Sequence, residues 1–411
     1  MPDAPAPNAH DPRPLGMLGG GQLGRMFVQA AHAAGRRVHV LSPDAGGPAA
    51  QVADRHTAAA YGDLDAVRAF AASVDGVSYE FENVPAATAA ACAAAGPVRP
   101  GENVLAVAQD RREEKAFLEA AGVPVAPWAP VAGEAELAAA GGRLGYPCVL
   151  KTARGGYDGK GQRVLHDAGE VPYAWADLQG GGGRVVPCVL EALVGFQAEV
   201  SVIAARDAHG GVLTWGPIAN SHRDHILDVS AVPAGLGDAV EAEAVAVTRR
   251  VVAALDLVGV LCVECFVTRE GTKGPGGAGS PGGAGGPRIL VNEIAPRPHN
   301  SGHLTIEAHG LSQFAAQVVC LSGGRLPATT APRGPAAMAN LLGDLWGEGG
   351  EPPRWAALDG REGVSLHRYG KARARPGRKM GHLTAVAGTA HEAVRNAVEA
   401  RAALRLPPAA K

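Results

Sequence analysis

Two strongly apolar segments late in the chain are each interrupted by a carboxylate, and this feature constrains the fold more than any other. Glu264 lies inside the apolar run 259–267, and Glu293 lies inside the run 288–294. Short apolar runs of this kind predict buried β-strands. A carboxylate inside such a strand costs several kcal/mol unless a cation compensates it. Because one loop joins the two predicted strands, we expect the two glutamates to lie side by side.

A divalent cation between Glu264 and Glu293 would offset both the cost of burying them and their mutual repulsion. Carboxylate oxygens are hard ligands, which favour Mg²⁺ over zinc. The alternative is that each glutamate forms an ion pair with an arginine of its own, so that no metal is needed. The cost of burial favours the metal but leaves both interpretations open.

Apolar runs alternate with helical patterns in the first part of the chain. The runs 15–18, 38–41 and 77–81 predict strands, and amphipathic patterns between them predict helices. Strands that alternate with helices are typical of a doubly wound parallel sheet, which binds ligands beyond the carboxyl ends of its strands. The segments 19–24 and 80–83 lie at such ends and are therefore candidate site segments.

A glycine motif follows the first predicted strand. Gly19, Gly21 and Gly24 match the dinucleotide-binding pattern, and Asp44 follows the second strand at about the required distance. An NAD-dependent dehydrogenase is therefore one interpretation. The other is a backbone cradle for an anion or a small substrate, with the amide of Gln22 as an additional ligand. The motif alone does not decide between them.

A second glycine cluster, residues 155–161, lies between two predicted strands. It is not a P-loop, because Arg154 and Gly161 stand where that motif has glycine and Ser or Thr. A glycine-rich hairpin can fold over phosphates and donate backbone N–H groups, and Lys151 can reach a phosphate from the preceding strand. The cationic segment 369–381 predicts a second phosphate clamp, in the last part of the chain.

The length of 411 residues allows two or three domains. Hairpin-like turns between residues 148 and 294 predict antiparallel pairing and thus a central α+β domain. The segment 271–287 consists almost entirely of Gly, Ala, Pro and Ser, which predicts a flexible insertion. We expect a disordered tail (1–13), an N-terminal Rossmann-like domain (14–124), a central domain (125–324) with a flap subdomain at about 125–195, and a small β-rich C-terminal domain (325–411).

Composition excludes several classes of function. Thirty-eight basic and 40 acidic side chains give a net charge of −2, which argues against nucleic acid as the main partner. No apolar run approaches the roughly 20 residues that a membrane span requires. The N-terminus lacks the basic and apolar regions of a signal peptide. Six cysteines in a chain of this length form no disulfide framework, which predicts a cytoplasmic location.

Several segments together resemble the ATP-grasp superfamily and, within it, the N5-carboxyaminoimidazole ribonucleotide synthetases of purine biosynthesis. They span about residues 14–390 and are 19–26 (GGGQLGRM), 79–85 (YEFENVP), 155–162 (GGYDGKGQ), 292–303 (NEIAPRPHNSGH) and 377–382 (GRKMGH). The resemblance implies a three-part ATP-grasp fold and a cytoplasmic homodimer. It further implies that ATP phosphorylates bicarbonate to carboxyphosphate, whose carboxyl group passes to the amine of aminoimidazole ribonucleotide.

The resemblance also implies a role for each matching residue. ATP would be bound by Arg111, Lys151, Gly156, Tyr157, Asp158, Gly159, Lys160, Gly161, Gln162, Glu191, Val194, Glu199, His222, Asn292 and Glu293, with Glu191 and Val194 near adenine and Glu199 near the ribose. Glu264 and Glu293 would hold Mg²⁺, with two ions expected. The ribonucleotide would be surrounded by Gln22, Glu82, Asp158, Asn300, Ser301, Lys371 and Arg378. Catalytic candidates are Asp158, Lys160 and Arg297, of which the last two would hold bicarbonate and its phosphorylated form.

The chain departs from the family pattern at a few places. Ala219 stands where an acidic residue is common, and His225 stands where glycine is usual. Both affect the surroundings of His222. Alternatives within the same fold are a formate-dependent glycinamide ribonucleotide transformylase and a non-catalytic ATP sensor. The sensor is disfavoured because a degenerate relative would most simply lose the metal ligands, and the dehydrogenase would leave Glu264 and Glu293 without a role.

Overall fold

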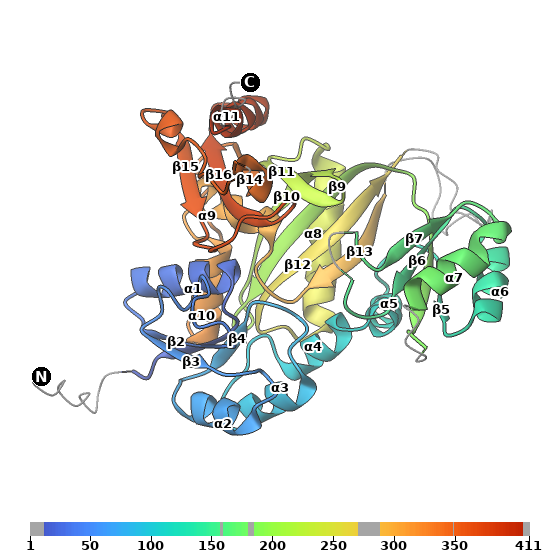
Figure 1. Ribbon diagram of the computed structural model, residues 1–411, viewed down its shortest axis with the longest axis horizontal. Helices are drawn as coiled ribbons and strands as arrows, with labels where there is room; N and C mark the ends of the chain where they lie inside the picture. Colours follow the sequence, from blue (N-terminus) through green and yellow to red (C-terminus); the bar gives the residue numbers. More distant parts are fainter. Residues whose placement is uncertain (1–11, 157–158, 180–184, 270–287, 348, 406–411) are drawn as a thin grey trace, which may run out of the picture.

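The computed structural model describes residues 12–156, 159–179, 185–269, 288–347 and 349–405. An N-terminal α/β part, a long central sheet that reaches the C-terminal helix, and a small sheet with two helices surround one central region (Figure 1). The predicted insertion 271–287 lies outside the described residues. Most of the predicted tail and the candidates Tyr157 and Asp158 do so too.

The N-terminal part is a parallel four-stranded sheet in the order β3-β2-β1-β4, which confirms the parallel sheet predicted here. Its strands are β1 (Leu15–Leu18), β2 (Val38–Ser42), β3 (Arg55–Ala58) and β4 (Val77–Tyr79). The helices of this part are α1 (Gln22–Ala33), α2 (Leu64–Ala72), α3 (Ala86–Ala93), α4 (Glu102–Ala108) and α5 (Arg111–Ala120). No apolar run marks β3 in the sequence, because this edge strand reads Arg-His-Thr-Ala and is at least partly exposed throughout.

A small antiparallel sheet in the order β5-β8-β6-β7 follows. Its strands are β5 (Trp128–Val131), β6 (Cys148–Thr152), β7 (Gln162–Leu165) and β8 (Cys188–Ala192). Helices α6 (Glu134–Leu144) and α7 (Val171–Gln179) cover one face and form a single apolar core with it. The glycine-rich segment joins β6 to β7, so it is a hairpin connection and opens no helix, as its sequence indicated.

The largest sheet has eight antiparallel strands in the order β13-β12-β9-β10-β11-β14-β16-β15. They are β9 (Phe196–Arg206), β10 (Val212–Arg223), β11 (Ile226–Val232), β12 (Gly259–Thr268), β13 (Ile289–Ala295), β14 (Ala336–Leu342), β15 (Val364–Arg368) and β16 (Lys379–Val386). Its helices are α8 (Asp238–Ala254), α9 (Thr305–Ala308), α10 (Gln313–Leu321) and α11 (Ala390–Ala403). The strands predicted for the small C-terminal unit thus extend the central sheet through the pairing of β11 with β14.

The middle of this sheet is covered by apolar side chains on both faces. Leu261, Val263 and Cys265 of β12 pack into a core that includes α8, whereas Val260 and Cys262 pack into a core on the other face. The alternation is that of a fully buried strand. Burial on both faces fixes the register of β12 firmly, because a slip by one residue would exchange its two sets of side chains.

The described helices include none that is long and apolar enough to cross a membrane. All six cysteines are buried and carry free thiols.

Candidate active site

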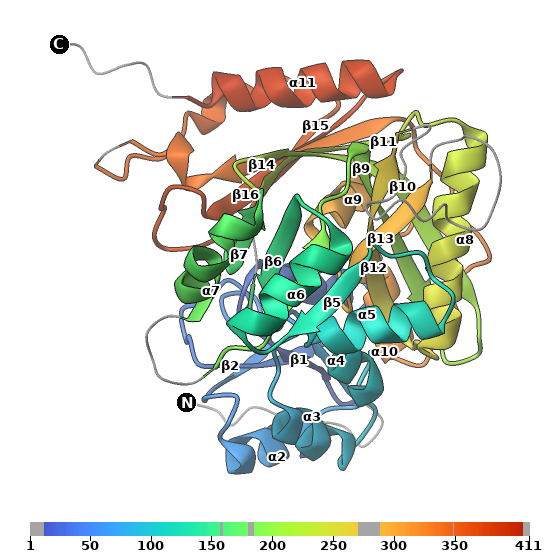
Figure 2. The same ribbon diagram turned by 90° about the vertical axis from the view of Figure 1, so that its right-hand side faces the viewer.

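A cavity of about 840 Å³ lies where the three sheets meet. When the molecule is turned by 90°, the small sheet lies in front of β12 and β13 (Figure 2). The cavity is lined by most of the site residues predicted from the sequence. These are Gln22, Glu82, Arg111, Lys151, Gly156, Gly159, Lys160, Gln162, Glu199, His222, Glu264, Asn292, Glu293, Arg297 and Asn300. Six other described candidates do not line it, namely Gly161, Glu191, Val194, Ser301, Lys371 and Arg378.

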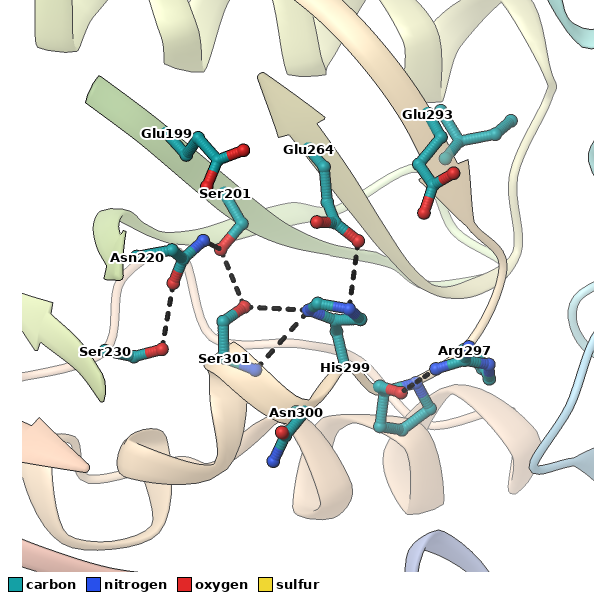
Figure 3. Close-up of polar contacts among 12 residues, drawn as sticks. Glu199, Ser201, Asn220, Ser230, Glu264, Glu293, Arg297, His299, Asn300 and Ser301 are labelled. Atoms are coloured by element: carbon teal, nitrogen blue, oxygen red, sulfur yellow. Dashed lines mark hydrogen bonds and ion pairs between the residues drawn. The ribbon is translucent and has the colours of Figure 1, made fainter. Parts of the chain in front are cut away.

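The two glutamates in apolar strands lie side by side, as expected. Glu264 and Glu293 are direct partners in the antiparallel pairing of β12 with β13. Their side chains are 18% and 35% exposed, and both open into the cavity (Figure 3). Glu293 forms an ion pair of 2.8 Å with Arg111, and Glu264 lies 3.0 Å from the imidazole of His299. Burial would raise the pKa of Glu293, but Arg111 outweighs it and holds this pKa at about 2.

A β-bulge places two consecutive side chains of β13 in the cavity. Glu264 pairs with Glu293, whereas the next residue Cys265 pairs with Val291, so Asn292 is an extra residue in β13. Successive side chains of a regular strand point to opposite faces, but a bulge lets neighbours share one face. Asn292 and Glu293 both line the cavity as a result.

The donors at this place fit a magnesium ion. In the described part of the chain, no group of three or more His, Cys, Asp and Glu side chains could hold a metal by itself. Glu264 and Glu293 would therefore supply carboxylate oxygens, and water and phosphate oxygens would complete the coordination. Mg²⁺ is bound in this way in many phosphate-transferring sites, because it keeps several of its waters. Zinc, which prefers Cys and His, finds no such set among the described residues.

His299 connects Glu264 to a series of buried polar groups (Figure 3). Its Nδ1 lies 2.9 Å from the hydroxyl of Ser301 and also faces the backbone N–H of Ser301. Because the backbone N–H can only donate, Nδ1 accepts, and the Nε2–H donates to Glu264. Ser301 is itself wholly buried and lies 2.6 Å from the hydroxyl of Ser201. Ser301 is thus placed to orient His299 and does not reach the cavity.

The glycine loop after β1 is occupied by a carboxylate of the chain itself. Glu80, which follows β4, accepts hydrogen bonds from the backbone N–H groups of Gly21 and Gly24, the latter at 2.8 Å. A Cβ atom at Gly19 or Gly21 would meet the Glu80 side chain at 2.1 or 2.7 Å, so both positions require glycine. In a dinucleotide-binding fold these N–H groups face the pyrophosphate. Because Glu80 takes their place, the structure contradicts the dehydrogenase interpretation of the motif and also its interpretation as a backbone cradle for an anion.

Arg297 lies beside this loop and forms a 2.7 Å ion pair with Glu82. Both side chains are only partly exposed and line the cavity. Burial would raise the pKa of Glu82, but the Arg297 guanidinium outweighs it and lowers this pKa. The pair therefore keeps a fixed cation at the end of the cavity formed by the N-terminal sheet.

The opposite end of the cavity is apolar. Its wall includes Val149, Val164, Leu193, Phe196 and Phe266. The rings of Phe196 and Phe266 are stacked with centroids 4.8 Å apart, and Val164, Leu193 and Phe196 are more exposed than core residues. Exposed apolar side chains around a cleft favour a flat apolar ligand group.

Two polar residues lie next to this apolar wall. Glu199 and His222 are paired, with 2.5 Å between the carboxylate and Nδ1, and both line the cavity. Beyond them, His225 adopts a left-handed backbone conformation with φ of 64°. Glycine adopts that conformation without strain, which accounts for the glycine that is usual at this position.

Lys151 forms part of the floor of the cavity, and a glutamate and a second lysine are buried beneath it. Lys151 lines the cavity and lies 3.1 Å from Glu191, which is also 3.2 Å from the buried Lys115. The carboxylate of Glu191 therefore faces the lysines, although the resemblance placed this residue near adenine. Lys115 was not among the sequence-derived candidates, since its position within an amphipathic helix gave no signal of a site.

Two cationic candidates of the C-terminal part lie outside the cavity wall. Lys371 donates to the carbonyl oxygen of Lys379 at 2.6 Å, and Arg378 donates to that of Arg373 at 2.7 Å. Lys379, which belongs to the cationic segment 369–381 predicted as a phosphate clamp, does line the cavity.

Glu114 is a further cavity residue that the sequence did not reveal. It is 2% exposed, and its carboxyl group accepts a 2.5 Å hydrogen bond from the backbone N–H of Ile294. Burial, with the charge of Glu293 adding to it, raises the pKa of Glu114 from 4.5 to about 8. The folded protein therefore keeps a proton that the unfolded chain loses above about pH 4.5.

Because of this proton, we expect the stabilising contribution of Glu114 to decrease as the pH rises. Its contribution to the free energy of unfolding is fully present below pH 4.5 and is lost as the pH rises through about 8. Glu114→Gln mimics the protonated form. The melting temperature of the variant, relative to that of the wild type, should therefore be higher at pH 8 than at pH 5. An equal change in melting temperature at both pH values would contradict the prediction.

Comparisons with known proteins agree with this geometry. Residues 13–109 match the ribonucleotide synthetase preATP-grasp domain, residues 116–314 the ATP-grasp domain, and residues 336–396 the phosphoribosylaminoimidazole carboxylase C-terminal domain. The chain is 41% identical over 375 residues to the N5-carboxyaminoimidazole ribonucleotide synthase of Brucella melitensis, covering 90% of this chain and 96% of that protein.

Solved structures show the same similarity. The N5-carboxyaminoimidazole ribonucleotide synthetase of Thermus thermophilus is 37% identical with a TM-score of 0.82, covering 97% of this chain and 100% of that one. The Aspergillus clavatus N5-carboxyaminoimidazole synthase, in complex with ADP and 5-aminoimidazole ribonucleotide, is 31% identical with a TM-score of 0.83. That match covers 96% of this chain and 99% of the fungal one.

Proposed function

Because the chain belongs to the N5-carboxyaminoimidazole ribonucleotide synthase family of ATP-grasp proteins, we propose that it is the ATP-dependent ligase that carboxylates 5-aminoimidazole ribonucleotide in purine biosynthesis. ATP phosphorylates bicarbonate, which releases ADP and forms carboxyphosphate. The exocyclic amine of the ribonucleotide then captures the carboxyl group, or CO₂ released from it, and phosphate leaves. The observation that carries the proposal is one cavity with an apolar end, a lysine-lined floor, two opposed carboxylates and a glycine loop.

ATP binds along the floor of this cavity. Its adenine lies against the apolar wall near residues 191–194, of which Leu193 reaches the cavity. Glu199 lies beside the ribose, and its pairing with His222 fixes the direction of its carboxylate. Lys151 contacts the phosphates through its ammonium group, and the glycine-rich hairpin between β6 and β7 contacts them through backbone N–H groups.

Glu264 and Glu293 would hold Mg²⁺, for which two ions are expected. When bound, the ions would supply positive charge against the phosphates of ATP. Arg111 forms an ion pair with Glu293 and thereby keeps this carboxylate ionised and oriented toward the cavity. His299 orients the carboxylate of Glu264 by donating its Nε2–H.

The ribonucleotide lies at the end formed by the N-terminal sheet, between the glycine loop and the segment around Asn300. Gln22, Glu82 and Asn300 line that end, whereas Lys371 and Arg378, also expected near the ribonucleotide, lie outside the cavity wall. Since Glu80 already occupies the backbone N–H groups of the loop, the ligand's anionic group is left to cationic side chains. Arg297 and Lys160 hold bicarbonate and its phosphorylated form, and closure of the flap excludes water that would hydrolyse carboxyphosphate.

The proposal is tested by measuring ADP release from the purified protein in the presence of Mg²⁺. Release should require ATP, bicarbonate and 5-aminoimidazole ribonucleotide together, and omission of bicarbonate or of the ribonucleotide should return it to the rate with ATP alone. If the complete mixture releases no ADP above that rate, the assignment fails. Light scattering of the same sample checks the homodimer expected for a cytoplasmic member of this family.

A further inference from the structure

A buried trio of charged side chains lies beneath the lysine-lined floor of the cavity. Lys115, in α5, is 0% exposed, and its Nζ lies 3.2 Å from Oε2 of Glu191 in β8. Lys151, at the end of β6, places its Nζ 3.1 Å from the same oxygen. The other oxygen of Glu191 is buried without a hydrogen-bond partner among the described residues. One carboxylate oxygen is thus shared by two ammonium groups.

The trio carries one more positive than negative charge, and only Lys151 can present it to a ligand. Lys115 has no exposed surface, and the side chain of Glu191 is 4% exposed, whereas that of Lys151 is 12% exposed and lines the cavity. Charges in such surroundings interact strongly, because little water screens them. The net positive charge of the trio therefore acts on a ligand through the Lys151 ammonium.

We propose that Lys115 is a positioning residue for nucleotide binding, which neutralises Glu191 so that Lys151 keeps an unbalanced positive charge toward the phosphates. The inference rests on the proposed function, in which Lys151 contacts ATP. Without Lys115, Glu191 and Lys151 would form a neutral pair, and the floor would attract the triphosphate less. Lys115 itself touches no ligand.

The direction of the pKa shifts agrees with this distribution of charge. Burial would raise the pKa of Glu191, but Lys115 and Lys151 outweigh burial and lower it, so Glu191 is a carboxylate. Burial lowers the pKa of Lys151, and Glu191 acts against this shift. Glu191 thus favours the charged form of Lys151, while Lys115 prevents that carboxylate from cancelling its charge.

Lys115 also has a structural contact, which the test must separate from its charge. Its Nζ donates a 2.9 Å hydrogen bond to the carbonyl oxygen of Asn292, the extra residue of the bulge in β13. A loss of binding in a Lys115 variant could therefore follow from a shifted bulge. Removing the charge of Glu191 at the same time distinguishes the two causes, because that change restores the charge balance but not the hydrogen bond.

The experiment measures the dissociation constant of MgATP by calorimetry for the wild type, Lys115→Met and Lys115→Met/Glu191→Gln. The trio then has a net charge of +1, 0 and +1. We expect Lys115→Met to weaken binding at least about tenfold and the double variant to return to within about threefold of the wild type. Arg143→Met is the matched control, because it removes one exposed cation in α6 and should leave binding unchanged.

Each other outcome overturns one of the two proposals. Wild-type affinity in folded Lys115→Met, or no recovery in the double variant, would overturn the role of Lys115. If Lys115→Met does not fold, the double variant alone decides, since binding far weaker than wild type would again contradict the charge balance. If the wild type does not bind MgATP at all, the proposed function itself fails.

Discussion

Replacement of Glu293 by glutamine is expected to reduce ADP release by at least about 1000-fold, with the fold retained. Glutamine has the shape of glutamate but no charge, so the opposed pair in β12 and β13 would lose half of its negative charge. The metal would bind more weakly, and Arg111 would lose its 2.8 Å partner at the edge of the phosphate site. Turnover at saturating ATP, bicarbonate, ribonucleotide and Mg²⁺ measures the effect.

Two controls separate chemistry from folding in the Glu293→Gln experiment. Thermal unfolding followed by circular dichroism should still show one cooperative transition. Glu119→Gln, an exposed change of the same kind in α5, should leave turnover unchanged. Turnover of Glu293→Gln at the wild-type rate would remove the metal from the mechanism, and Glu293 would then be only the ion-pair partner of Arg111.

The parts of the fold that were predictable are those whose signal lies in short stretches of sequence. The apolar runs that became β1, β2 and β4 predicted the parallel sheet, because strands buried on both faces leave continuous apolar segments. The polar edge strand β3 had no such signal. Pairing between distant segments is not encoded in a local pattern either, so the extension of the central sheet by β14 became visible only in the structure.

Some features of the candidate site were likewise predictable from the sequence, and others were not. Carboxylates in apolar strands were informative because their burial is costly, and Glu264 with Glu293 lie side by side as expected. The bulge at Asn292 was not predictable, since it depends on how two strands pair. The positions of Glu80 and Lys115 depend on their partners across the fold, which are the glycine loop and Glu191. From the sequence alone, a charged residue whose partner is distant in the chain cannot be distinguished from an exposed charged residue.

Arg297→Met is expected to reduce turnover by at least about 1000-fold, because it removes the fixed cation proposed to hold bicarbonate and carboxyphosphate. The same change leaves Glu82 without its 2.7 Å partner. We expect this to lower the free energy of unfolding by about 2 kcal/mol, less than for a fully buried pair because water in the cavity reaches both side chains. Loss of activity alone would therefore not distinguish chemistry from an unpaired carboxylate.

The double variant Arg297→Met/Glu82→Gln makes that distinction. Removing both charges should restore most of the lost stability, since no unpaired ion remains at this end of the cavity. Turnover should stay as low as in Arg297→Met, because the cation is still missing. Chemical denaturation and ADP release, measured on the same preparations, test both statements. If the double variant recovers turnover together with stability, Arg297 serves only to neutralise Glu82, and the bicarbonate site must be sought at Lys160.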